Sequence, residues 1–481
     1  MLEALSLFNE LRKKDINWIM DQGMERQVIS KTVVIREGAP VTSLFFVLEG
    51  LLSVSMDTES TTSIAMLGPG SLFGEISLLL GDKASANVIA EENSLLLELD
   101  HMVITSKLDQ DFAFAARFFR ALACLGSQRL KQTNNRLMEV SVSKDQIDFL
   151  SHTEWDKLSS QIITYKEALI QADKLAIKND GCVPESLAED LIQGFHQFSA
   201  ELNHILNSEN EALNNELGRR CQREFLPFMV MSTIGERMYA KPRGYAGDYW
   251  TIELMYRNEA TGTGRLGPVI DRAFRAQPAN RAVMNRRALL FDEILKTLNP
   301  HTQTHVTSLA SGPAAELFDV FSQIDDKRKL KASCIDIDLQ ALAFVGDQCD
   351  KLGLRNQMDL HNGNLVYLAT GRQMLHLPPQ DLMYSIGLID YFNDKFVILL
   401  LNYIYEQLKP GGRVILGNFH VGNPNKALMD HILEWELIHR SEEDMHRLFR
   451  HSKFKCPCTA IHFEPEQVNL FAECQKPFAD Q

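Results

Sequence analysis

Small and acidic residues in the C-terminal third of the chain have the spacing of a site for an adenosine-containing ligand. A turn at Ala310-Ser311-Gly312 follows an apolar run, and its small residues allow a backbone to approach a ligand closely where a helix starts. About twenty residues later a second apolar run ends in Asp336-Ile337-Asp338, where a carboxylate can hold ribose hydroxyls. Asn364 stands where the next strand is expected to end. Asp338 and Asn364 have alternative explanations, a helix N-cap and a turn residue respectively.

The elements that would position these residues alternate between strands and helices from about residue 300 onward. Strands are predicted at 305–309, 332–337, 381–386 and 413–419, separated by helices at 314–323, 339–352 and 395–408. A helix at 426–435 and a β pair at 460–463 and 468–472 complete the pattern. Such alternation is typical of a parallel sheet with helices on both faces.

The earlier part of the chain shows two other patterns. Glycine and aspartate turns separate short β-type runs at 31–35, 44–48, 51–55, 63–67, 87–90 and 94–99. This spacing predicts a small barrel or sandwich, followed by a helix at 112–130. From about 141 to 240 apolar residues recur at helical spacing with a break at 181–184, so this segment is predicted to be α-helical.

The composition restricts the class of protein. The chain has 481 residues, of which 63 are acidic and 49 basic, so its formal net charge is −14. This length implies about three domains, and the acidic balance argues against nucleic acid as the main partner. No apolar run approaches the ~18–20 residues that span a bilayer. Eight cysteines are too sparse for a disulfide framework, and the first residues lack signal-peptide features, so a cytoplasmic protein is expected.

The N-terminal β-rich region resembles a known ligand-binding module. The segments 35–38 (IREG), 46–54 (FVLEGLLSV) and 70–79 (GSLFGEISLL) match the cyclic-nucleotide-binding domain in order and spacing. This is the jelly-roll module of the catabolite activator protein and of protein kinase A regulatory subunits. The resemblance implies that backbone N–H groups after Gly74 face a cyclic phosphate and that Glu75 binds the ribose hydroxyl.

This pocket departs from the family pattern where an arginine normally pairs with the phosphate. Ala84 stands at that position, with Lys83 and Ser85 beside it as partial substitutes. Loss of a charge-assisted contact of ~2–3 kcal/mol weakens binding about 30–100-fold. Two alternatives are open: the module binds a cyclic nucleotide as a regulator, or it serves homodimerisation or another ligand. The absence of a compact helix-turn-helix pattern after the module disfavours a transcription factor.

The C-terminal pattern resembles the class I S-adenosylmethionine-dependent methyltransferases. The resemblance rests on the strand end at 334–338 (CIDID) and on the helix–turn–strand at 408–416 (LKPGGRVIL). It implies a Rossmann-like domain that binds S-adenosylmethionine through Ala310, Ser311, Gly312, Asp336, Ile337, Asn364, Ser385 and Gly387. The family's D-x-G-x-G-x-G motif is altered, because Ser308, Ala310 and Ala314 occupy its acidic and outer glycine positions.

A closer likeness is to bacterial methyltransferases related to the 3-hydroxypalmitate methyl ester synthase, which act on a fatty-acid carboxylate. It rests on 243–249 (RGYAGDY), 418–420 (NFH), 435–440 and 442–445. The likeness implies that the RGYAGDY segment caps the cofactor through Tyr245, Asp248 or Tyr249. The alternative for this segment is an interdomain packing turn.

The same resemblance places residues 384–391 beside the transferred methyl group. Asp390, Tyr391 and His420 are the candidate catalytic residues. A carboxylate acceptor is already ionised at neutral pH and needs no general base, whereas a hydroxyl or amine acceptor usually needs one. Residues 241–290 carry an excess of basic residues, which is either a binding site for an anionic acceptor or a solvated or interdomain face.

The sequence thus predicts a multidomain protein with a jelly roll at 1–140, a helical connector and cap at 141–284 and a Rossmann-like methyltransferase domain at 285–481. The predicted function is methyl transfer from S-adenosylmethionine to a small or fatty carboxylic acid, regulated or dimerised through the N-terminal module. One alternative is a non-catalytic ligand sensor that uses the methyltransferase fold as a scaffold. Another is a methyltransferase that binds RNA or DNA. No metal site is predicted, since Cys456 and Cys458 lack the spacing of zinc ligands.

Overall fold

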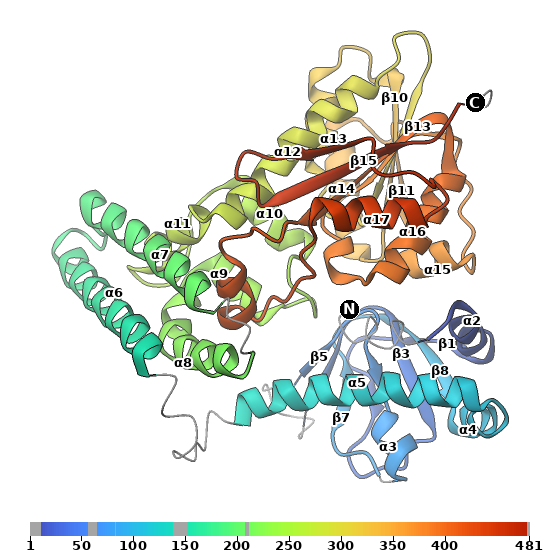
Figure 1. Ribbon diagram of the computed structural model, residues 1–481, viewed down its shortest axis with the longest axis horizontal. Coiled ribbons are helices and arrows are strands. Elements are labelled where there is room, and N and C mark those ends of the chain that lie inside the picture. The colour runs from blue at the N-terminus through green and yellow to red at the C-terminus, as the bar shows by residue number, and fades with distance from the viewer. Residues whose placement is uncertain (1–10, 56–64, 82, 138–151, 207–210, 479–481) are drawn as a thin grey trace.

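The computed structural model describes residues 11–55, 65–81, 83–137, 152–206 and 211–478. The chain forms a β-rich N-terminal part, a helical segment that extends to one side, and an α/β part around a long sheet (Figure 1). In the described residues no helix combines the length and the apolar character that crossing a membrane requires.

The N-terminal part is a sandwich of two antiparallel sheets. Its strands are β1 (Met24–Val28), β2 (Val33–Ile35), β3 (Ser43–Glu49), β4 (Leu52–Ser55), β5 (Ala65–Leu67), β6 (Leu72–Phe73), β7 (Asn87–Ala90) and β8 (Ser94–Asp100). One sheet has the order β1-β8-β3-β6 and the other the order β2-β7-β4-β5. Alternate residues of β3 point to opposite faces, so Phe45 and Val47 fill the space between the sheets while Leu44 and Phe46 face helices. The sandwich confirms the jelly-roll prediction.

Helices pack on the outer face of the first sheet. The helices of this part are α2 (Lys13–Gln22), α3 (Glu75–Leu80), α4 (His101–Gln110) and α5 (Phe112–Leu137). Ile19 of α2, Ile104 of α4 and Phe118 of α5 are fully buried in one apolar cluster with the sheet. Helix α5 confirms the helix predicted at 112–130 and continues to Leu137.

The helical segment lies between the two β-containing parts in the sequence. It consists of α6 (His152–Lys178), α7 (Glu185–Ile205), α8 (Glu211–Met229), α9 (Thr233–Ala240), α10 (Tyr249–Arg257), α11 (Gly267–Arg275) and α12 (Pro278–Thr297). Tyr165, Phe195 and Phe225 join α6, α7 and α8 with ring centroids 5.4 to 6.5 Å apart. Their core is continuous with the core under the C-terminal sheet. Helix α12 continues without a break through residue 284, and residue 140 lies outside the described ranges. The predicted domain boundaries at 140 and 284 therefore stay predictions.

The α/β part is built on a mostly parallel sheet. Its strands are β9 (Thr304–Leu309), β10 (Leu330–Asp336), β11 (Met358–Asn362), β12 (Gln380–Ser385), β13 (Leu408–Phe419), β14 (Ala460–Phe463) and β15 (Asn469–Gln475). They follow the order β11-β10-β9-β12-β13-β15-β14, with β15 antiparallel to both of its neighbours. The order reverses between β9 and β12, and such a switch point opens a crevice at the carboxyl ends of the strands.

Both faces of this sheet are covered by helices. The helices are α13 (Ala315–Gln323), α14 (Leu339–Leu352), α15 (Leu365–Thr370), α16 (Asp394–Gln407) and α17 (Glu442–His451). Tyr384 packs with α12, α13 and α14 on one face, whereas its neighbour Met383 packs with α15, α16 and α17 on the other. The strands predicted for this part and the helices predicted at 314–323, 339–352 and 395–408 are present, although β13 begins earlier, at Leu408.

One predicted helix is wrong in kind and length. In place of a helix at 426–435 there is a single π-helical turn, Leu428–Ile432. The backbone N–H of Leu433 donates to the carbonyl of Leu428, five residues earlier, which gives the turn its wide geometry. The backbone N–H of Trp435 then donates to the Met429 carbonyl at 2.7 Å. Turns of this kind are frequent at functional sites because they re-aim side chains.

Candidate functional site

The turn after β9 faces the crevice at the switch point. Ala310, Gly312 and Ala314 all have φ between +50° and +53°, a left-handed conformation that is strained for alanine. A Cβ on Gly312 would meet no heavy atom within 4 Å, so the space beside the turn is open. The Ser311 hydroxyl is buried and has no hydrogen-bond partner in the described part of the chain. An open, strained turn with one unused hydroxyl fits a ligand that approaches the backbone.

The carboxylate of Asp336 connects this turn to the end of β10. One oxygen accepts the Gly312 N–H at 2.8 Å and the other accepts the Asp338 N–H at 2.9 Å. The side chain is 7% exposed, and burial raises its pKa to about 6. At neutral pH it is therefore a carboxylate held rigidly by two backbone donors, with lone pairs left for hydroxyl groups.

The guanidinium of Arg243 joins the end of β10 to the N-terminal part. It donates to both oxygens of Asp338 at 2.7 and 2.9 Å and to Glu92 at 3.2 Å. Gln340 completes the group, since its amide donates to Glu92 at 3.0 Å. Asp338 also accepts the Gln340 N–H at 2.9 Å, which confirms the N-cap alternative for this residue. Glu92 of the N-terminal part is thus linked through Arg243 to Asp338, two positions beyond Asp336.

In the RGYAGDY segment, Tyr245 and Asp248 have different surroundings. Tyr245 lies near the strand-end carboxylates: burial, with the charges of Asp338 and Asp336, holds the pKa of its phenol well above the usual range. Asp248 instead caps α10, accepting from Trp250 N–H at 3.0 Å and from Arg237 at 2.9 Å. Its oxygens are occupied by protein donors, so the predicted contact of Asp248 with the cofactor is not supported.

Other predicted cofactor residues also hold the local structure together. Asn364 caps α15 by accepting the Val366 N–H at 2.9 Å, and the Ile337 carbonyl accepts the Asn362 side chain at 3.3 Å. The Ser385 hydroxyl donates to the Leu309 carbonyl at 2.9 Å across the switch point. These bonds place the ends of β9, β10 and β12 side by side, as the predicted site requires.

The three candidate catalytic residues are all engaged by protein groups. Asp390 is 2% exposed and accepts the Phe419 N–H at 2.6 Å, and burial raises its pKa to about 6. The Tyr391 hydroxyl donates to the Ala246 carbonyl at 2.8 Å and accepts from Trp435 at 2.9 Å. His420 contacts Glu442 at 3.2 Å through Nε2 and accepts the Gly422 N–H at Nδ1. In this arrangement none of the three side chains is a free general base.

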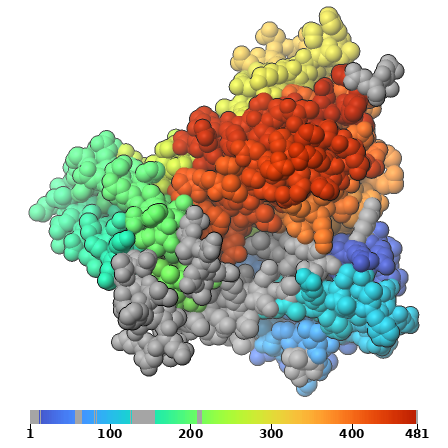
Figure 2. Space-filling view, viewed as in Figure 1, coloured from blue at the N-terminus to red at the C-terminus, as the bar shows by residue number. Residues whose placement is uncertain are grey.

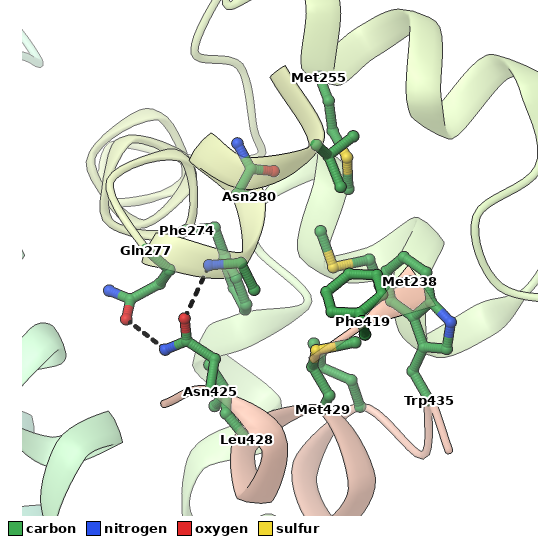
Figure 3. A pocket seen from close by; sticks show the side chains of 13 residues that line it. Met238, Met255, Phe274, Gln277, Asn280, Phe419, Asn425, Leu428, Met429 and Trp435 are labelled. Carbon is green, nitrogen blue, oxygen red and sulfur yellow. Dashed lines mark hydrogen bonds between the residues drawn. The ribbon is translucent and has the colours of Figure 1, made fainter. Parts of the chain in front are cut away.

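An apolar cavity is lined in part by Trp435 (Figure 3), the residue whose indole N–H donates to the Tyr391 hydroxyl. It holds about 30 Å³, which is room for about two water-sized groups. The lining comes from α9 to α12, the end of β13 and the π-helical turn: Met238, Met255, Phe274, Gln277, Ala279, Asn280, Val283, Phe419, Asn425, Leu428, Met429, Leu433 and Trp435. The side-chain amide of Asn425 donates to the side-chain oxygen of Gln277 at 3.0 Å. The side-chain amide oxygen of Asn280 is buried and has no hydrogen-bond donor among the described residues. Sequence reasoning did not predict this cavity.

The arginines of 241–290 other than Arg286 are engaged by acids of the same chain. The pairs are Arg257–Glu253, Arg265–Asp173, Arg272–Glu185, Arg275–Asp271, Arg281–Glu466 and Arg287–Asp319. The excess charge of this stretch is therefore used in surface and interdomain pairing. Those arginines do not form the predicted site for an anionic acceptor.

The predicted N-terminal pocket lies at the start of α3. Gly74 has φ +88°, and a Cβ there would come within 2.6 Å of the Ser43 carbonyl, so the turn requires glycine. Glu75 is 8% exposed, whereas Lys83 and Ser85 are exposed. Ala84 is held by backbone bonds to Ala39 and Gly38 at 2.9 and 2.8 Å.

Comparison with known proteins assigns this part. The model of the family "Cyclic nucleotide-binding domain" matches residues 25–111. Residues 25–111 form a cyclic nucleotide-binding domain. A protein of Rhodopseudomonas palustris named as a potassium channel is 36% identical over 100 residues, 21% of this chain and 24% of its own. A cyclic nucleotide-gated potassium channel of Mesorhizobium japonicum is 35% identical over 99 residues, 21% of this chain and 26% of its own.

The chain thus spans about a quarter of the length of these curated relatives. Among solved structures, a possible exported protein from Bordetella parapertussis is similar over 60% of this chain and 97% of its own, with 18% identity and a TM-score of 0.44. A similarity at this level does not assign a function.

The N-terminal part lies against the rest of the chain (Figures 1 and 2), and the described residues show several contacts between them. Besides the group around Arg243, Arg372 donates to Asp21 of α2 at 2.8 Å. Tyr367 of α15 packs against the apolar cluster of the domain. Gly244 and Gly68 also meet, since a Cβ on Gly244 would lie 3.0 Å from Gly68. The RGYAGDY segment is therefore an interdomain packing turn as well as a neighbour of the cofactor candidates.

Proposed function

We propose that the α/β part is an S-adenosylmethionine-dependent methyltransferase that the cyclic nucleotide-binding domain regulates. The observation that carries the proposal is the Asp336 carboxylate, buried at the carboxyl end of β10 and bonded to Gly312 across the switch point. The mostly parallel sheet, with its switch point between β9 and β12 and an antiparallel β15 beside β13, supports the proposal.

The residues present fit this cofactor. The open space at Gly312 and the unpaired Ser311 hydroxyl suit the methionine end, and Asp336 suits the ribose hydroxyls. Tyr245 and Asn364 would flank the nucleoside. When bound, S-adenosylmethionine supplies an electrophilic methyl group and its leaving group, so the protein contributes position and electrostatics.

The acceptor that suits the site best is a carboxylic acid with an apolar chain. Asp390, Tyr391 and His420 are engaged elsewhere, which suits an acceptor that is already ionised. The cavity that Trp435 helps to line is apolar, and the flexible side chains of Met238, Met255 and Met429 can move to admit a chain longer than the present volume. The unused oxygen of Asn280 would accept a hydroxyl on that chain.

Regulation would act through Arg243. Its guanidinium is shared between Glu92 of the cyclic nucleotide-binding domain and Asp338, two residues from Asp336. A movement of Glu92 on ligand binding therefore changes the partner of Asp338 and the end of β10. A coupling of this kind is reciprocal between the two ligands.

The rival proposal is a sensor in which the methyltransferase fold binds ligands without turnover, favoured by the engaged catalytic candidates. Lipid and metabolite extracts incubated with the full chain and isotope-labelled S-adenosylmethionine, analysed by mass spectrometry, separate the two. Labelled methyl esters support the enzyme. Cofactor binding without any labelled product supports the sensor, and absence of cofactor binding by calorimetry overturns both.

A further inference from the structure

The buried guanidinium of Arg286 is only partly satisfied by the groups around it. Arg286 lies on α12, is 6% exposed, and donates from Nη1 to the Ile386 carbonyl at 2.8 Å. Its Nε is buried and has no hydrogen-bond acceptor among the described residues. An unsatisfied buried donor costs ~1–3 kcal/mol and calls for an explanation. A ligand that accepts from Nε would provide one.

The charge of Arg286 is also left without an ion pair in the described part of the chain. Its neighbours on α12 differ in this respect, because Arg281 pairs with Glu466 and Arg287 pairs with Asp319. The buried Glu316 carboxyl, which accepts the Tyr384 hydroxyl at 2.7 Å, has a pKa raised by burial. The charge of Arg286 opposes the effect of burial on the pKa values of Glu316, Asp390 and Tyr256. None of these groups accepts from Nε, which is therefore the donor that an entering anion would meet.

The position of Arg286 relates it to both the cavity and the methyl-transfer region. Val283 lines the cavity, and Arg286 is three residues further along α12, about 4.5 Å along the axis on the same side of the helix. Gly387 leaves room for the guanidinium, since a Cβ there would lie 3.2 Å from Nη1. The buried guanidinium of Arg286 therefore lies between the apolar cavity and the carboxyl end of β12.

We propose that Arg286 binds the carboxylate of the methyl acceptor while the apolar chain of the acceptor occupies the cavity. This inference rests on the proposed methyltransferase function. A guanidinium–carboxylate contact fixes both distance and orientation, and it leaves a lone pair of the carboxylate free. An oxygen of the acceptor carboxylate would form a bond to the methyl carbon as the bond from that carbon to the sulfur of S-adenosylmethionine breaks. The electron pair of the broken bond would remain on the sulfur. The step releases no proton, which agrees with the lack of a free base.

The test compares acids with uncharged analogues on the full chain. Straight-chain carboxylic acids of six to sixteen carbons and their primary amides are titrated by calorimetry, and methyl transfer to the acids is measured separately. The wild type is expected to bind the best acid at least 30-fold more tightly than its amide. Arg286→Gln removes this preference and raises KM for the acid about 100-fold, while the Kd for S-adenosylmethionine stays within threefold.

Matched variants separate charge, shape and folding. Arg287→Gln, which breaks the pair with Asp319, serves as the control and leaves the preference for acids unchanged. Arg286→Lys keeps the positive charge but lacks the planar guanidinium, and it is expected to retain part of the preference for acids over amides. This variant replaces Arg286→Gln in the test if the glutamine variant does not fold. Equal losses for acid and amide, or a loss confined to S-adenosylmethionine, overturn the assignment. A wild type that prefers acids but transfers no methyl group overturns the proposed function and leaves the Arg286 assignment standing.

Discussion

The two candidate ligand sites differ in how completely the chain organises them. At the end of β10, Asp336 is buried, held by two backbone donors and tied through Asp338 to Arg243. In the cyclic nucleotide-binding domain the glycine turn and the buried Glu75 are present, but Ala84 occupies the position at which the sequence resemblance predicts a phosphate-binding arginine. The difference shows that a binding fold can be kept while the charge that supplies much of its affinity is absent.

Removal of the Asp336 carboxylate should have the largest effect on this comparison. Asp336→Ala deletes the carboxylate that is proposed to accept two charge-assisted hydrogen bonds from the ribose hydroxyls, each worth ~1.5–3 kcal/mol. The Kd for S-adenosylmethionine is therefore expected to rise about 100-fold or more. Calorimetric titration measures the change. Asp350→Ala removes an exposed acid of α14 that pairs with Arg355, and serves as the control with an unchanged Kd. Wild-type affinity in Asp336→Ala would place the ligand elsewhere.

Restoration of the missing charge should strengthen the weaker site. Ala84→Arg is expected to lower the Kd for cyclic AMP or cyclic GMP about 30–100-fold, the equivalent of ~2–3 kcal/mol. Titrations with both nucleotides report the gain, and Lys83→Ala, at an exposed position, changes the Kd by less than threefold. Submicromolar binding by the unmodified chain, with no gain in the variant, would remove the contrast between the sites.

The protonation of Asp336 should make the stronger site depend on pH. Its pKa of about 6 means that the carboxylate accepts hydroxyl donors above pH 6 and is neutralised below it. The Kd for S-adenosylmethionine is thus expected to rise about tenfold between pH 7 and pH 5. The ligand-free protein shows the opposite sign: the folded state holds this proton more tightly than the unfolded state, so this contribution to stability is present at low pH and is lost as pH rises through 6.

Calorimetry between pH 5 and 8 and urea unfolding over the same range measure the two trends. Asp336→Asn, which cannot titrate, gives a flat and weaker affinity. A wild-type affinity that is equally flat would show that another group binds the ribose.

The smallest expected effect concerns communication between the sites. In the Ala84→Arg background, cyclic nucleotide should shift the Kd for S-adenosylmethionine several-fold, because Glu92 and Asp338 share Arg243. Glu92→Gln should abolish this shift while each ligand alone binds within threefold of its former affinity. The adjacent Glu91 pairs with Lys31 and Ser53 inside the domain, so Glu91→Gln is the control that keeps the shift. A shift that survives Glu92→Gln assigns the coupling to another contact.

Local sequence patterns predicted most of the fold because periodicity and turn residues act over short distances. The β sandwich followed from apolar runs between glycine turns, and the N-cap role of Asp338 was foreseen as an alternative. The N-cap of Asp248 had a signal too, since an aspartate directly before a helix is a preferred capping residue. The π-helical turn had no such signal in the sequence, because its geometry depends on the hydrogen bond that Trp435 makes to the Met429 carbonyl in the folded chain.

The candidate site was predicted only where the chain order alone brings residues together. Strand ends of a parallel sheet meet at one edge, so the turn at Gly312 and the acid Asp336 could be paired from the sequence. The bond between Glu92 and Arg243 joins residues 151 apart, and the cavity draws on segments from residue 238 to residue 435. Such contacts depend on how domains and helices dock, which no local pattern encodes.

The contact between Gly68 and Gly244 has a consequence for the order of events during synthesis. The two glycines are about 175 residues apart, so at ~5–20 residues per second a ribosome adds Gly244 on the order of 10–35 s after Gly68. The β sandwich is complete in sequence long before that and folds first, with Gly68 exposed. We therefore expect the later segments of the nascent chain to assemble against a surface that is already folded, so that the N-terminal domain serves as a template for their packing.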